Sequence, residues 1–424
     1  MRLPRRFQEL SALLEAMPYV TADGRAGLLA QGNFGGESSK IPELKVDDIK
    51  DTTVLSALFR DYTFWASAYL LEPCHLNILR QGSYGMGRQT LPRNIAMPLA
   101  TVARKLNMKP FMEYALSYAL YNWKRKEPTQ PIQYDNLELI RTFTGSLNEA
   151  GFILVHVAMV ANTPHLVRAT LSALDACEKK DRLLFNAAIH KFQLAMRAIN
   201  QEMETMWRRS DPDDYKNFRT FIMGTKNQPM FPNGVLYEGV SPEPLFFRGE
   251  SGANDSIIPT ADNLFQIYDR MPENPLTSIL RDFRSYRPRP HGRWLEMVHR
   301  KAQAFRVRAY ALQERESALL MLECLDEVRD FRQRHWNFAK EYIIKHSNHP
   351  VATGGSPIVT WLPNQLSTLL DLMNEVVQVI RQKYVQEARE ESMQRLHTVE
   401  ARLQSQDSIL KREVRTLRTK FRDQ

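Results

Sequence analysis

The chain has 424 residues, of which 43% are hydrophobic and 25% are charged, and its formal net charge is +9. This length allows two or three domains with a large buried core, which excludes a small disulfide scaffold or a disordered tail. The most apolar run, FILVHVAMVA at 152–161, is far shorter than the roughly 20 residues that cross a bilayer. It predicts a buried helix, and we expect no membrane partner.

The beginning of the chain and its cysteines indicate a cytoplasmic protein. The segment MRLPRRFQEL is basic but has no apolar signal core, and Glu9 and Glu15 argue against a mitochondrial presequence. The cysteines Cys74, Cys177 and Cys324 are odd in number and far apart. We therefore expect packed thiols, not a disulfide framework or a thiolate zinc site.

Helical periodicity runs through most of the chain from Val54, and alternating strand-like runs are scarce, so the predicted fold class is all-α. In the first half, helices are expected at 58–70, 98–105, 111–124 and 150–161. Loops rich in glycine and proline are expected at 31–42, 81–98, 127–131, 226–239, 241–255, 286–292 and 347–363. The predicted domains are a small N-terminal helical domain (1–145), a large C-terminal helical domain (146–380) and a basic C-terminal helix (381–424).

The C-terminal helix carries a leucine at every seventh position, at Leu396, Leu403, Leu410 and Leu417. This is the spacing of a coiled coil, which would allow self-association. Because the alternate core positions include acidic residues, a single amphipathic surface helix is an equal alternative.

A basic stretch extends from Arg281 to Arg308, where arginines far outnumber Asp282 and Glu296. Nucleic-acid binding is one interpretation of such a stretch. However, no nucleic-acid module surrounds it, and its prolines and interleaved apolar residues favour a loop that leads into a helix. We therefore expect no nucleic-acid partner.

The segment RQRHWNFAKEYI places His335 in the middle of a predicted helix. Helical spacing aligns it with an apolar stripe, which consists of Leu325, Val328, Phe331, Phe338, Ala339 and Tyr342. An inward imidazole needs a partner, which can be a backbone carbonyl, a carboxylate or a metal. From these residues alone, a satisfied core histidine is the commoner case and a metal ligand is the alternative.

A second histidine, His156, also lies within an apolar helix. Hydrolase and nucleotide-binding motifs such as GxSxG, HExxH and the Walker loop are missing from the sequence. Helix bundles can hold haem through an inward histidine, and the polar loops RGESGAN (248–254) and VATGGSP (351–357) could frame such a pocket. In DYKNFR, Tyr215 and Arg219 share a helix face, which suits stacking on a ring and binding a carboxylate.

Taken in order, several segments resemble the indoleamine 2,3-dioxygenase family. They are LPRNIAMPL (91–99), YALSYALYNWKRKEP (114–128), AGFILVH (150–156), NGVLYEGV (233–240), FRGESGANDSIIP (247–259), FRSYRPRPHGRWL (283–295), the helix of His335 and the ATGG loop. The resemblance extends from about Leu44 to Thr360 and leaves both ends of the chain unmatched.

The resemblance implies a two-domain haem b enzyme that uses dioxygen to open the pyrrole ring of L-tryptophan, giving N-formylkynurenine. His335 matches the proximal ligand of the haem iron, and Arg332 and Asp262 match residues that support it. The implied substrate-binding residues are Tyr114, Ser117, Tyr118, Tyr215, Arg219, Gly252 and Thr353. Among these, Arg219 corresponds to the arginine that receives the substrate carboxylate.

Two positions depart from the family pattern. His156 stands where the animal enzyme has a small hydroxyl residue, and it resembles the distal histidine of tryptophan 2,3-dioxygenases. We interpret it as a catalytic helper that hydrogen-bonds the indole N–H or dioxygen. Asp214 replaces the first of two aromatic residues and could weaken tryptophan binding. Alternative functions are therefore a dioxygenase for another indole or pyrrole, and a haem sensor or scaffold without catalysis.

Overall fold

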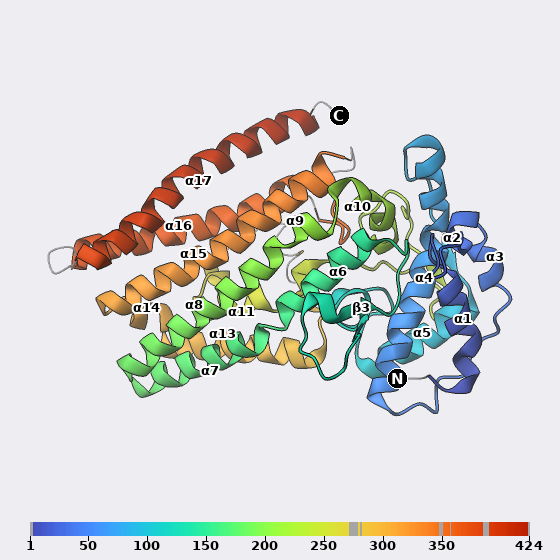
Figure 1. Ribbon diagram of the computed structural model, residues 1–424, viewed down its shortest axis with the longest axis horizontal. Helices are drawn as coiled ribbons and strands as arrows, with labels where there is room; N and C mark the ends of the chain where they lie inside the picture. The colour runs from blue at the N-terminus through green and yellow to red at the C-terminus, as the bar shows by residue number, and fades with distance from the viewer. Residues whose placement is uncertain are drawn as a thin grey trace.

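The computed structural model describes residues 3–422 apart from 271–278, 280–281, 347–350, 357 and 385–389. Helices dominate this part of the chain, which confirms the all-α prediction (Figure 1). Its strands form two small sheets. The parallel sheet pairs β1 (Thr90–Leu91) with β4 (Leu236–Tyr237), and the antiparallel sheet pairs β2 (Trp123–Arg125) with β3 (Leu137–Leu139).

The helices follow one another along the chain with short connections. The α-helices of the first part are α1 (Gln8–Ala16), α2 (Leu28–Gln31), α3 (Phe34–Ser38), α4 (Thr52–Gln81) and α5 (Arg93–Leu106). Those of the second part are α6 (Leu147–Val160), α7 (Thr163–Lys179), α8 (Arg182–Glu204), α9 (Met206–Arg209), α10 (Pro212–Arg219), α11 (Ile257–Leu264), α13 (Arg289–Phe305), α14 (Val307–Ala311), α15 (Arg315–Phe338), α16 (Ile358–Tyr384) and α17 (Glu390–Arg422). Short 3-10 helices are η1 (Arg5–Phe7), η3 (Tyr134–Asn136), η4 (Thr220–Ile222), η5 (Gly252–Asn254) and η6 (Tyr268–Arg270), and π-helical turns are η2 (Tyr114–Tyr118) and η7 (Ala339–Ile344).

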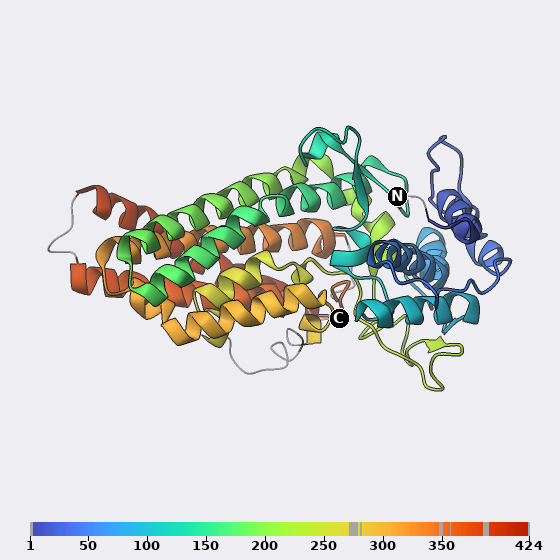
Figure 2. The same ribbon diagram turned by 90° about the horizontal axis from the view of Figure 1, so that it is seen from below.

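Buried apolar side chains gather into two large clusters. The helices that carry them lie toward opposite ends of the elongated molecule (Figure 2). The first surrounds α4, a long helix that begins where the Asp51 carboxylate accepts the amide of Thr53 at 2.7 Å. It also includes Phe221–Met223 and Phe247, which come from much later in the sequence. Because the first cluster draws on both halves of the chain, the division at 145/146 stays a prediction.

The second cluster is a helix bundle in which α8 packs against α7 and α15, and α15 packs against α16. One segment of this bundle, Leu147–Lys179, is long and apolar enough to cross a membrane by length and composition. It consists of two helices, α6 and α7, and half of its most apolar window is buried against the rest of the chain. This burial is typical of core helices.

Three predicted boundaries are wrong. The expected helix at 111–124 is only the π turn η2 followed by β2. The Glu113 carboxylate accepts the amides of Ala115 and Leu116, which starts the short turn. The Asn122 side chain then donates to two backbone carbonyls at the point where the turn gives way to β2. The expected loops at 81–98 and 347–363 end early, since α5 and α16 begin before Pro98 and Pro363 and continue through them. Tertiary packing thus overrides the helix-breaking tendency of proline.

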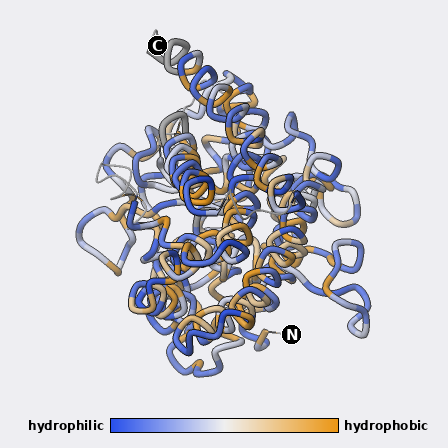
Figure 3. The backbone as a smooth tube through the Cα atoms, turned by 90° about the vertical axis from the view of Figure 1, so that its left-hand side faces the viewer, coloured by the Kyte–Doolittle hydropathy of each residue, from blue (hydrophilic) through white to orange (hydrophobic). Residues whose placement is uncertain are grey.

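The C-terminal helix α17 folds back along its own chain and packs against α16 and α15. Its leucines face these helices: Leu396, Leu403 and Leu410 are nearly fully buried. Apolar and polar segments alternate along this helix (Figure 3), and Arg395 pairs with Glu323 and Glu316 of α15. The structure therefore matches the amphipathic surface helix, while self-association stays a prediction.

We expect Leu403→Ala to lower the free energy of unfolding by about 2–4 kcal/mol, because it leaves a cavity in a buried seam. The measurement is denaturant unfolding of the full chain. Gln404→Ala, on the exposed face of the same helix, serves as the control and should change stability by less than about 0.5 kcal/mol. Unchanged stability accompanied by loss of an oligomer would instead place the seam against a second chain.

Candidate functional site

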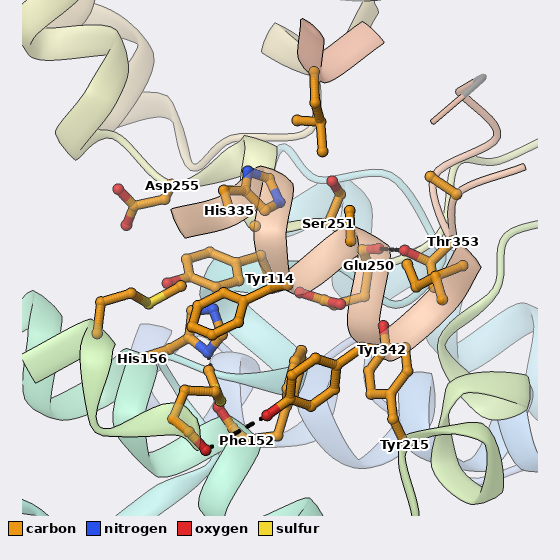
Figure 4. A pocket seen from close by; sticks show the side chains of 18 of the residues that line it. Tyr114, Phe152, His156, Tyr215, Glu250, Ser251, Asp255, His335, Tyr342 and Thr353 are labelled. Carbon is orange, nitrogen blue, oxygen red and sulfur yellow. Dashed lines mark hydrogen bonds between the residues drawn. The ribbon is translucent and has the colours of Figure 1, made fainter. Parts of the chain in front are cut away.

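A large cavity lies where the helix bundle meets the loops near the first cluster, and it holds about 1080 Å³ of empty space counted out to its opening. Helices α6, α10, α15 and η7 and the loops at 250–255 and 352–356 line it (Figure 4). The lining side chains from these elements include Tyr114, Phe152, His156, Tyr215, Glu250, Asp255, Phe331, His335, Phe338, Tyr342 and Thr353.

His335 projects into this cavity from the last turn of α15. The predicted stripe is confirmed, since Phe331, Phe338, Ala339 and Tyr342 line the cavity with it. No described residue shares a hydrogen bond with the imidazole. Burial, together with the neighbouring His156, lowers the pKa of His335 to about 4, so the ring is neutral at physiological pH. A neutral imidazole without a partner is the form that binds a metal.

His156 reaches the same cavity from α6. Its Nδ1 lies 2.8 Å from the carbonyl oxygen of Phe152, so Nδ1 carries the proton and donates to this carbonyl. Burial lowers the pKa of His156 below its ordinary value, which keeps the ring neutral. Its Nε2 is therefore an acceptor, and it lies toward Gly252, where an added Cβ would be 3.9 Å away.

A second cavity, of about 860 Å³, adjoins the first and shares His335, Phe331 and Asp255 with it. Its wall contains the predicted supporting pair: Nη2 of Arg332 lies 2.8 Å from each carboxylate oxygen of Asp262. Nε and Nη1 of Arg332 are buried and have no partner among the described residues. Two further arginines, Arg284 and Arg287, line this cavity, which is therefore suited to anionic groups.

The two predicted polar loops meet at the cavity rim. The Thr353 hydroxyl donates to the backbone carbonyl of Glu250 at 2.6 Å, and the amide of Gly224 donates to the carbonyl of Thr353 at 3.0 Å. The approach is close, because a Cβ on Gly249 would lie 2.2 Å from the nitrogen of Gly224. Both loops are thus fixed to each other and to the segment after α10.

Some predicted residues do not line either cavity. The Ser117 hydroxyl donates to the carbonyl of Glu113 within η2. The Arg219 guanidinium is buried and donates to the carbonyl of Val351 at 2.8 Å and to the Tyr84 hydroxyl at 3.3 Å. Asp214 points elsewhere, since it accepts from Ser146 and Asn217. The substrate-binding roles of Ser117 and Arg219 stay predictions, and Asp214 does not form part of the cavity wall.

Other functional residues were missed in the sequence. Glu250 and Asp255 place carboxyl groups in the first cavity, and Arg284 and Arg287 place cations in the second. The signals were present: both acids lie in or beside the loop RGESGAN, and both arginines belong to the basic stretch. These four residues could be assigned to the site only once the structure showed that both segments face His335.

The donor set at His335 limits what kind of metal site this can be. Within the described ranges, no group of three or more His, Cys, Asp or Glu side chains could hold a metal ion. His335 therefore offers one protein ligand with open space on two sides. A metal that brings its own planar ligand fits this arrangement, and the arginines of the second cavity would match acidic groups at its edge.

Comparison with known proteins agrees with this geometry. The family model for indoleamine 2,3-dioxygenase matches residues 39–397. Indoleamine 2,3-dioxygenase 1 of Rattus norvegicus is 26% identical over 323 residues, which is 76% of each chain. Indoleamine 2,3-dioxygenase 2 of Homo sapiens is 29% identical over 294 residues, covering 65% of this chain and 70% of its own. A 6-hydroxytryptophan 2,3-dioxygenase of Fusarium equiseti is 27% identical over 271 residues, covering 61% and 64%.

The fold and the match together define an all-α oxidoreductase of the dioxygenase class. The chain belongs to the indoleamine 2,3-dioxygenase family, as a divergent member. The last part of α17, after residue 397, lies outside the family match.

We expect Asp262→Ala to destabilise the protein by about 3 kcal/mol, because it leaves the buried Arg332 cation unpaired. Denaturant unfolding of the haem-free chain measures this, and adding Arg332→Met should recover part of the loss. Asp175→Ala breaks the exposed pair with Lys179 and should cost less than about 0.5 kcal/mol. Equal effects of the two single variants would contradict a buried, structurally important pair.

Proposed function

We propose that the protein is a haem-dependent dioxygenase that converts L-tryptophan to N-formylkynurenine, the first step of the kynurenine pathway. The observation that carries the proposal is the neutral imidazole of His335, which lies between two adjoining cavities and has no hydrogen-bond partner among the described residues. His335 would be the proximal ligand, and Arg332, Arg284 and Arg287 would face the carboxylates of haem b. When bound, ferrous haem supplies the activation of dioxygen.

The protein's own residues orient the indole and exclude water. The aromatic side chains of Tyr114, Phe152 and Tyr342 surround the first cavity and suit a flat apolar ring. Nε2 of His156 is an acceptor of fixed tautomer, suited to the indole N–H. Thr353 would contact the amino-acid part of the substrate, as the family resemblance implies, by accepting a hydrogen bond from it while its hydroxyl donates to the carbonyl of Glu250.

Arg219 would reach the substrate carboxylate only after a local rearrangement. Its guanidinium is bound to the carbonyl of Val351, two residues before Thr353. In the present arrangement Arg219 holds this loop, so we propose that the guanidinium exchanges the carbonyl of Val351 for the carboxylate when the substrate binds.

The fungal relative named for 6-hydroxytryptophan supports a second candidate function, which is turnover of a substituted indole. The cytoplasmic location stays a prediction.

The first experiment compares wild type with His335→Ala by haem titration and absorption spectroscopy, followed by product formation from L-tryptophan in air. Wild type should show a Soret band and form product, whereas His335→Ala should lose the specific haem complex and all turnover. Gln333→Ala, which leaves the imidazole in place, is the matched control. Haem binding without turnover of any indole would refute the dioxygenase and favour a haem sensor or scaffold.

A second experiment tests His156. His156→Ala should weaken binding of L-tryptophan by roughly 3- to 10-fold, because one hydrogen bond to the indole N–H is lost. Binding of 1-methyl-L-tryptophan, which has no N–H, should not weaken. The measurement is equilibrium titration of the haem protein with each compound. An equal loss for both compounds would assign His156 to the shape of the cavity instead.

A further inference from the structure

Glu250 is a buried carboxyl group that the proposed mechanism does not use. The residue is 5% exposed, and its side chain extends toward the middle of the first cavity (Figure 4). No described residue donates a hydrogen bond to its carboxyl group. The two neighbouring acids are engaged: Asp255 accepts the amide of Ile257 at 2.6 Å, and Glu113 accepts the amide of Ala115 at 2.8 Å.

Among the described residues that line the cavity, no lysine or arginine is present to pair with Glu250. Burial, with a smaller contribution from the charge of Glu113, raises the pKa of Glu250 to about 8. A buried carboxyl group without a counter-charge is unfavourable unless a ligand supplies one.

The backbone holds Glu250 in a fixed position. Its amide donates to the carbonyl of Ile222 at 3.1 Å, and its carbonyl accepts the Thr353 hydroxyl at 2.6 Å. The preceding Gly249 lies against Gly224, at a distance that no larger residue could reach without a shift. A carboxyl group on such a rigid base can bind a ligand at little cost in conformational entropy, and a bound ammonium group would supply the counter-charge that favours its ionised form.

We propose that Glu250 binds the ammonium group of the substrate and is the residue by which this cavity distinguishes a protonated amine from a neutral group at the same position. An ammonium group has three donors and forms short, charge-assisted hydrogen bonds with a carboxylate. The indole ring would lie against the aromatic wall, and the amine would face Glu250. The inference rests on the proposed function in one respect: it takes the ligand to be an indole.

The test is calorimetric titration of the haem-loaded full chain with tryptamine and with tryptophol, in which a neutral hydroxyl replaces the ammonium. Wild type should bind tryptamine roughly 10- to 100-fold more tightly than tryptophol. Glu250→Gln keeps the size of the side chain and should reduce this ratio to less than about threefold. Asp255→Asn neutralises the other carboxyl group of the cavity and should leave most of the preference.

Two results would overturn the proposal: equal affinity of wild type for both compounds, which needs no variant, or an unchanged ratio in Glu250→Gln. Turnover of L-tryptophan is measured in parallel. A tryptamine preference that Glu250→Gln removes, without any turnover, would support the ammonium site and refute the dioxygenase. Turnover together with an unchanged ratio would refute the ammonium site alone.

Discussion

The site depends on the imidazole of His335, which lies among apolar side chains and shares no hydrogen bond with any residue that the structure describes. A polar ring on an apolar stripe usually bonds a nearby carbonyl, as His156 does with the carbonyl of Phe152. The far side of the same helix is fixed by α17, where Glu413 accepts the indole N–H of the buried Trp336 at 2.7 Å and pairs with Lys340 at 2.6 Å. About one turn after His335, α15 ends at Phe338 and the π turn η7 begins, which carries Tyr342 to the cavity wall.

The two cavities beside His335 differ in charge. The first is walled by aromatic rings and contains carboxyl groups, whereas the second contains three arginines and the buried Asp262. Such a separation suits two different ligands side by side, one with acidic edges and one with a flat apolar ring. Burial, with a like charge nearby, shifts the pKa of a group in each cavity: burial and the charge of Glu113 raise the pKa of Glu250 to about 8, and burial and the charge of Arg284 lower the pKa of Arg287 to about 10.

Close backbone contact connects the site to the smaller core. Phe221–Met223 belong to the first hydrophobic cluster, and the residues that follow them bond the loops of Glu250 and Thr353. Arg219 adds a side-chain contact to the same loop through the carbonyl of Val351. The position of the cavity rim is therefore determined by contacts between the two hydrophobic clusters, and not by either cluster alone.

The sequence by itself determined the all-α class and the inward orientation of His335 and His156, because helical spacing is a local property. It also determined the two polar loops at the cavity rim, because turn residues act locally. Through the family resemblance it also placed Arg332 and Asp262 near His335, whereas their ion pair was found only in the structure. It did not predict that 111–124 is mostly non-helical, that Arg219 bonds a backbone carbonyl, or that Glu250 is left without a counter-charge. These features arise from contacts between residues far apart in the chain, such as Glu250 with Thr353 and Arg219 with Val351. Only the tertiary structure could decide them, because burial and partner choice are set by distance in space, which the order of residues does not give.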